Sequence, residues 1–132
     1  MKRKSVLDAY ALLAYLKEES GHARVRELMS PGGGYLLINS VNAGEVFYVI
    51  ARTHGTKAAE YFLSVILPSL PIRVVENSFE DVIDAARIKA AHALSFADCF
   101  AAATAIRERA PFVTGDPEFK KLGKTVEIDW VG

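Results

Sequence analysis

The sequence has almost no cysteine and no long apolar run. Cys99 is the only cysteine among 132 residues, which excludes an internal disulfide. Its apolar neighbours favour a small buried side chain in a reducing compartment. The apolar stretches are far shorter than the ~20 residues that cross a bilayer, and the basic start MKRKSVLD does not continue into a cleavable signal pattern. We therefore expect a cytoplasmic protein without a membrane segment.

The sequence also lacks an excess of either charge. Sixteen basic and sixteen acidic residues give a net charge of zero, so nothing global indicates a nucleic-acid-binding protein. The three histidines, His22, His54 and His92, are scattered, and none is assigned to a metal. If the chain handles RNA, local patches or a bound cation must provide the attraction.

What the sequence does contain is an alternation of strand and helix patterns. With 51% apolar residues, the chain fits a single domain over 1–132. Strands are predicted at 4–7, 35–38, 72–75, 111–114 and 126–131, where 126–131 alternates like an edge strand with one wet face. Helices are predicted at 9–17, 22–29, 41–52, 57–67 (ended by Pro68 and Pro71), 79–91, from HALSFADCFAAATA through 108, and at 117–122. This order predicts an α/β fold with a mostly parallel five-stranded sheet and helices on both faces.

Four acids fall where such a sheet binds ligands. Asp8 ends the first strand, Glu45 lies in the helix after the second, Asp98 lies one turn into the helix before the fourth, and Asp116 ends the fourth. The carboxyl ends of parallel strands gather at one edge, so we expect an acidic pocket there.

Each acid also has a purely structural interpretation. Asp8 and Asp116 fit helix N-caps, and Asn42 to Glu45 and Ser95 to Asp98 each fit a capping box. For any acid taken alone the cap is the better explanation. Taken together, the acids would repel one another, and neither Asp8 nor Asp116 has an adjacent basic residue. A divalent cation would resolve this repulsion, and all-oxygen ligands favour Mg²⁺ or Mn²⁺ over zinc.

Four segments carry a family resemblance. VLDAYALLAYL, SVNAGEVFYVI, LSFADCFAAATA and FVTGDPEF, in this order and spacing, resemble the PIN-domain ribonucleases, and most closely the VapC toxins of toxin–antitoxin pairs. The resemblance spans essentially the whole chain. It implies a three-layer α/β/α sandwich with an acidic pocket for Mg²⁺ or Mn²⁺, and it places the four family acids at Asp8, Glu45, Asp98 and Asp116.

The resemblance further implies hydrolysis of RNA phosphodiesters. Asp8, Asp98 and Asp116 are then the expected metal ligands, while Glu45 either completes the set or orients the attacking water. Thr114 matches a small hydroxyl residue beside the last acid, Ser95 caps the helix that carries Asp98, and Asn42 is a further supporting residue. Candidate RNA-backbone contacts, each of which solvated surface also explains, are Lys2, Arg3, Lys4, Lys120, Lys121 and Lys124.

Relatives of this kind are commonly homodimers held inactive by an antitoxin, so both partners are expected, with no small organic cofactor. Apolar residues at Tyr61, Phe62, Val65 and Ile66 exceed one buried stripe, which fits either core or interface. A housekeeping RNA-processing nuclease and a non-catalytic PIN-fold binding module remain as alternatives. A receiver domain would need paired acids after the first strand, and a haloacid-dehalogenase phosphatase would need Asp where Tyr10 stands, so both are disfavoured.

Overall fold

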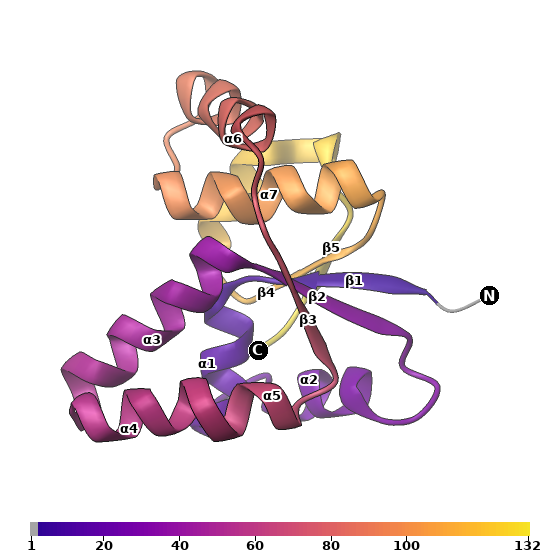
Figure 1. Ribbon diagram of the computed structural model, residues 1–132. Helices are drawn as coiled ribbons and strands as arrows, with labels where there is room; N and C mark the ends of the chain where they lie inside the picture. The colour runs from indigo at the N-terminus through magenta and orange to yellow at the C-terminus, as the bar shows by residue number, and fades with distance from the viewer. Residues whose placement is uncertain (1–2) are drawn as a thin grey trace.

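A computed structural model describes residues 3–132, which form a five-stranded sheet between two layers of helices (Figure 1). The strands are β1 (Lys4–Leu7), β2 (Tyr35–Asn39), β3 (Ile72–Val75), β4 (Phe112–Thr114) and β5 (Ile128–Trp130), in the spatial order β3-β2-β1-β4-β5. Every neighbouring pair is parallel. The predicted α/β fold is therefore confirmed, with a sheet that is parallel throughout.

The helices cover the two faces unequally. One face carries α1 (Ala9–Leu16), α2 (His22–Met29), α3 (Ser40–His54) and the segment that follows it, and the other carries α6 (Phe79–Ala91), α7 (Phe96–Glu108) and the 3₁₀ segment η2 (Pro117–Thr125) (Figure 1). This arrangement is the expected three-layer sandwich. Within residues 3–132, no helix combines the length and apolar character needed to cross a bilayer.

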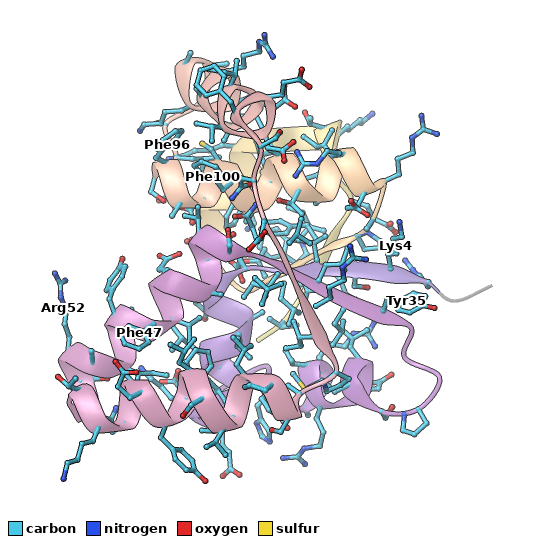
Figure 2. All side chains as sticks on the ribbon, viewed as in Figure 1. Lys4, Tyr35, Phe47, Arg52, Phe96 and Phe100 are labelled. Carbon is cyan, nitrogen blue, oxygen red and sulfur yellow. The ribbon has the colours of Figure 1, made fainter. Side chains whose placement is uncertain are left out.

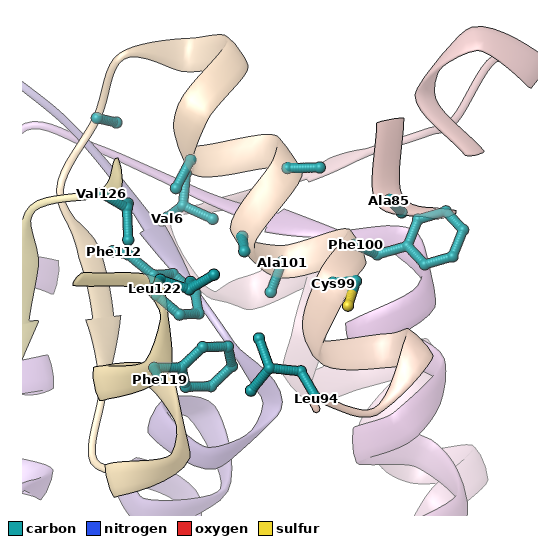
Figure 3. Packing of buried hydrophobic residues seen from close by; sticks show 14 of the residues in the cluster. Val6, Ala85, Leu94, Cys99, Phe100, Ala101, Phe112, Phe119, Leu122 and Val126 are labelled. Carbon is teal, nitrogen blue, oxygen red and sulfur yellow. The ribbon is translucent and has the colours of Figure 1, made fainter. Parts of the chain in front are cut away.

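Strand alternation divides the core between the two faces. Leu7 and Val113 pack toward α1 and α2, whereas Val6 and Phe112, one position earlier on each strand, pack toward α7. Figure 3 shows this second cluster, in which Phe112 and Phe119 meet edge to face with ring centroids 4.6 Å apart. A run of alanines on α7 lets that helix lie close to the sheet, and Cys99 is fully buried there, as predicted. The first turn of α7, which carries Asp98, is therefore packed against the core.

The helix predicted at 57–67 continues past Pro68. It consists of α4 (Thr56–Tyr61), the π-helical segment η1 (Phe62–Ile66) and α5 (Leu67–Ser69). Proline has no N–H to donate to the carbonyl four residues back, and the wider π turn before it, closed by the Leu67 amide on the Phe62 carbonyl, accommodates the mismatch. The expected stop at Pro68 is therefore wrong. Phe62 lies in the core, while Tyr61 and Val65 are exposed.

Strand β5 is an edge strand, as predicted, but the face that carries Asp129 is not simply exposed to solvent. Asp129 is half-buried and accepts hydrogen bonds from Arg24 Nε at 3.2 Å and Nη2 at 2.7 Å, which ties β5 to α2. Trp130, from the apolar side of the alternation, is 44% exposed. The alternation failed here because α2 supplies a basic partner that the local sequence does not reveal.

Candidate active site

The site forms along the last row of side chains at the carboxyl edge of the sheet. Leu7 is in register with Ile38 on one side and Val113 on the other, so the residues that follow them, Asp8, Asn39 and Thr114, share a row. Thr114 is in register with Trp130, which extends the row to the edge strand. We call these residues, Asn39, Asp8, Thr114 and Trp130, the carboxyl-edge row. Because side chains alternate, they project toward α7.

Asp8 is held by two short hydrogen bonds. Its Oδ1 accepts from the Ala11 amide at 2.8 Å and thereby caps α1, and its Oδ2 accepts from Thr114 Oγ1 at 2.5 Å. Thr114 Oγ1 in turn accepts from the Asp116 amide at 3.0 Å. Asp8 is therefore both a helix cap and a member of the cluster, so the two interpretations of this residue are compatible.

The environment of Asp8 favours its protonated form. Burial, with only 4% of the residue exposed, is the main cause that raises the pKa of this carboxyl to about 7, and the charges of Asp98 and Asp116 act in the same direction. The hydrogen bonds from Thr114 and Ala11 oppose the rise. Within residues 3–132, no ion pair with lysine, arginine or histidine involves any of the four acids. Asp8 thus lacks the usual compensation for a buried carboxylate.

Asp98 and Glu45 both lie close enough to Asp116 for its charge to affect them. Ser95 is the N-cap of α7, as predicted, and its Oγ accepts from the Asp98 amide at 3.1 Å. Burial is the main cause of the raised pKa of both Asp98 and Glu45, and the charge of Asp116 raises both further. Ser95 lowers the pKa of Asp98 in part. The structure therefore brings the four predicted acids into one mutually repelling group.

The capping box predicted from Asn42 to Glu45 is wrong. Helix α3 begins at Ser40, its N-cap is Asn39, whose Oδ1 accepts from the Val41 amide at 2.9 Å, and Asn42 lies inside the first turn. Asn42 is fully buried; its Nδ2 donates to the Ala97 carbonyl at 3.0 Å, and its amide lowers the pKa of Glu45. Asn42 therefore joins α3 to the start of α7. Its Oδ1 is the only buried side-chain polar atom in residues 3–132 without a hydrogen-bond partner.

A neutral polar network behind the acids was not predicted. Asn39 Nδ2 donates to Asn77 Oδ1 at 2.8 Å and to Thr104 Oγ1 at 2.9 Å, and Asn77 Nδ2 donates back to Asn39 Oδ1 at 3.0 Å and to Ser40 Oγ at 3.1 Å. These bonds join β2, the loop before α6 and the middle of α7. The available signal was a polar residue, Asn39, that ends a strand in which every residue after Tyr35 is buried.

The donor chemistry of the site fits a hard cation. Its oxygens come from carboxylates, a hydroxyl and the unpartnered Asn42 amide, the ligand types that Mg²⁺ and Mn²⁺ prefer. Among residues 3–132, however, no three His, Cys, Asp or Glu side chains are arranged so that they could together hold a metal ion as they stand. The group therefore fits by its ligand types, and water or a shift of side chains would have to complete the coordination.

The candidate RNA contacts divide between the two edges of the sheet. Lys121 Nζ donates to the Ala93 carbonyl at 2.9 Å and pairs with Glu118, so it lies beside the start of α7, and Lys120 lies over Trp130. Lys124 is exposed on the same segment. Lys4 begins β1 at the amino edge of the sheet (Figure 2), and Arg3 precedes it, whereas Asp8 follows the other end of β1. Lys2 falls outside the described residues.

Comparison with known proteins gives one family. The PIN domain matches residues 5–125. No curated protein matches significantly. Similar solved structures include the DNA-bound VapBC2 of Rickettsia felis (TM-score 0.74, 16% identity, 98% of this chain and 99% of that one) and Mycobacterium tuberculosis VapC20, a Sarcin-Ricin loop cleaving toxin (TM-score 0.72, 18% identity, 90% and 95%). A third is the DNA-bound VapBC of Salmonella typhimurium (TM-score 0.72, 16% identity, 96% and 97%).

These likenesses show the same fold over almost the whole length of each chain. The matched span of the family also contains all four acids and the threonine that bonds Asp8. The chain therefore belongs to the PIN domain family.

Proposed function

We propose that this protein is a Mg²⁺- or Mn²⁺-dependent endoribonuclease and the toxin of a type II toxin–antitoxin pair. The observation that carries the proposal is Asp8, which is buried among three further acids without a basic partner in residues 3–132. Such a cluster costs stability, and a cation would remove the cost. The similar toxin VapC20 cleaves the Sarcin-Ricin loop, which supports an RNA substrate for this chain.

The side chains of the site have different proposed roles, which follow from their surroundings. Asp8, Asp98 and Asp116 would hold the metal, which supplies polarisation of a phosphoryl oxygen and a lowered pKa for bound water. Thr114 fixes the orientation of Asp8 through its 2.5 Å hydrogen bond. Glu45 is half-buried and its pKa is raised by burial, which makes it a stronger base toward the attacking water.

The nuclease proposal has a direct test. Purified protein is incubated with single-stranded and structured RNAs in Mn²⁺, in Mg²⁺ and in chelator, beside the Asp98→Asn variant. We expect cleavage only with metal and only by the wild type, while circular dichroism shows that the variant is folded. Equal cleavage by the two proteins would overturn the proposal.

An antitoxin is the proposed protein partner, since several similar structures are toxin–antitoxin complexes. A candidate docking place is an apolar cavity of about 490 Å³ between α1, α3 and α4, lined in part by Leu16, Ile50 and Tyr61. Tyr61 is 57% exposed, so Tyr61→Asp should leave folding and basal cleavage intact. We expect this variant to lose co-purification with the product of the neighbouring open reading frame; unchanged co-purification would place the partner elsewhere.

A homodimer is proposed as well. Leu63 and Val65 are exposed on the π-helical segment, and Leu63 lines a second apolar cavity of about 390 Å³. Sedimentation should give a dimer for the wild type and a monomer for Leu63→Asp. A wild-type monomer at micromolar concentration would overturn this assignment.

A further inference from the structure

Trp130 occupies an unusual position at the end of the carboxyl-edge row. It is the only tryptophan in the sequence, yet it is 44% exposed on a short edge strand. Its register partner is Thr114, which bonds Asp8, so the two residues stand on neighbouring strands about 4.8 Å apart and face the same way. The largest apolar side chain of the chain is thus placed beside the acids, where core packing does not require it.

The ammonium group of Lys120 lies over the Trp130 ring. Lys120, four residues after Asp116, places its Nζ 5.9 Å from the centroid of the Trp130 ring. Both residues are exposed, and Lys120 lies on the segment that Asp116 caps, so its charge can attract a phosphate backbone that the acids alone would repel. An exposed aromatic ring with an adjacent cation is the combination that proteins use to hold unpaired bases, since the ring stacks on the base and the cation meets the backbone.

Packing alone does not account for the pair. The neighbouring Ile128 and Val131 are the β5-region residues that pack into the two core clusters, and Asp129 anchors the strand to α2. An exposed cation–π contact contributes only ~0.5–1 kcal/mol, little reason to leave a tryptophan in water.

We propose that Trp130, with Lys120, stacks on an unpaired base next to the scissile phosphate, so that a paired base is excluded at this position. This inference rests on the proposed ribonuclease function and assigns Trp130 and Lys120 as the residues that position the substrate. A base on Trp130 places the adjoining backbone beside Thr114 and Asp8, whereas a paired base is not free to stack on the ring.

Because Trp130 is the sole tryptophan, its fluorescence reports stacking directly. The full chain carrying Asp98→Asn, which keeps RNA intact, is titrated in Mg²⁺ with a 12-nucleotide single-stranded RNA, with the same RNA annealed to its complement, and with copies bearing one abasic site at successive positions. We expect saturable quenching by the single strand, none by the duplex, and loss of quenching for an abasic site at one position.

Affinity measured by anisotropy of a labelled RNA completes the test. Trp130→Leu should weaken single-strand binding roughly 5- to 100-fold, the range for loss of one stacked base, and Trp130→Phe should retain most of the affinity. In the active protein, Trp130→Leu should raise KM more than it lowers kcat. The matched control is Tyr35→Leu, because Tyr35 is also an exposed aromatic residue but lies at the opposite edge of the sheet (Figure 2).

The outcomes separate this inference from the nuclease proposal. RNA cleavage that depends on Asp98, with no change in Trp130 fluorescence at saturation or with equal quenching by duplex, would overturn the stacking role and leave the nuclease standing. Quenching that follows protein concentration instead of RNA would assign Trp130 to a protein interface and also overturn it. Absence of any cleavage, with selective quenching by single strands, would remove the nuclease and retain the base site.

Discussion

The two edges of the sheet use charge in opposite ways. At the amino edge, Lys4 Nζ meets Glu108 Oε1 at 3.0 Å and Arg3 pairs with Glu127 at 3.6 Å, so each charge has an opposite partner from a distant element. At the carboxyl edge, Asp8 is buried next to other acids whose charges raise its pKa, with no such partner in residues 3–132. The amino edge resembles an ordinary protein surface, and the carboxyl edge holds charge at the expense of stability.

This difference points to the carboxyl edge as the functional part of the sheet. Carboxyls with perturbed pKa values cluster at sites that bind ligands, because a bound ligand can compensate for a group that destabilises the free protein. Removing charge from the carboxyl edge should stabilise the fold and end the activity, whereas removing charge from the amino edge should do neither. The contrast can be tested by substitution at each edge.

The largest expected effect is on stability against pH. The pKa of Asp8 is about 7 in the folded chain against 3.8 for the free group, so between these values the folded state holds the extra proton. The stabilisation is full below pH 3.8 and is lost as pH rises through about 7. The difference between these two pKa values corresponds to roughly 4 kcal/mol in the free energy of unfolding. Urea titrations at several pH values measure it.

Asp8→Asn provides the control for this pH dependence, because the variant keeps an oxygen for the Ala11 cap but cannot ionise. The difference between wild type and variant should grow in the variant's favour from pH 4 to 7 and then level off. Mg²⁺ should raise the melting temperature of the wild type at pH 8, and much less at pH 5 or in the variant. A constant difference across this range would show that Asp8 titrates normally.

The next effect is the loss of cleavage in Asp98→Asn. Replacing a residue that supports a bound metal only indirectly costs ~10–100-fold, so loss of a direct ligand should cost at least about 100-fold in kcat/KM. Because burial raises the pKa of Asp98, removal of its charge should leave the melting temperature equal or higher. Single-turnover cleavage and thermal denaturation measure the two quantities. A variant that melts earlier yet still cleaves would return Asp98 to the role of a helix cap.

How far the sequence predicts this site depends on whether the signal is local. The positions of the acids along the chain, the carboxyl ends of the strands and the Ser95 cap each follow from a few adjacent residues; the structure has the cap as predicted and the carboxyl end of every strand within one residue of its predicted position. The Asn42 capping box failed because Asn39, Ser40 and Asn42 are all capping residue types near the start of α3, and Asn39, not Asn42, takes the cap. Sequence rules of capping do not choose among such close candidates.

Features that depend on distant pairs were not predicted. The network of Asn39, Asn77 and Thr104 joins three elements far apart in the chain, and none of these residues has a distinctive neighbour. The exposed position of Trp130 was likewise not predicted; Lys120 lies over its ring, and the Arg24–Asp129 pair anchors β5 from the other face. Periodicity shows that one strand face differs from the other, but only the tertiary structure shows what covers each.

Thr114→Val should give a smaller effect at the carboxyl edge. The change keeps the shape of the side chain and removes the donor to Asp8 Oδ2, one of the interactions that lower the pKa of Asp8. We expect the pKa of Asp8 to rise further, the pH profile of kcat/KM to shift toward alkaline pH, and activity at pH 7 to fall about tenfold, the size of one hydrogen bond to a charged group. Thr114→Ser keeps the donor and should restore the profile; a Ser variant as impaired as the Val variant would show that the methyl group matters instead.

The smallest effect is expected from Lys4→Met at the amino edge. The Lys4–Glu108 pair is partly exposed, and such pairs contribute less than ~1 kcal/mol, so the urea midpoint should fall only slightly. Cleavage and its dependence on salt should be unchanged, because Lys4 begins β1 while Asp8 follows its end. Parallel measurements on Lys121→Met, from the side of the acids, give the comparison. If Lys4→Met lowers RNA affinity as much as Lys121→Met does, RNA extends across both edges and the division of charge between stability and function does not hold.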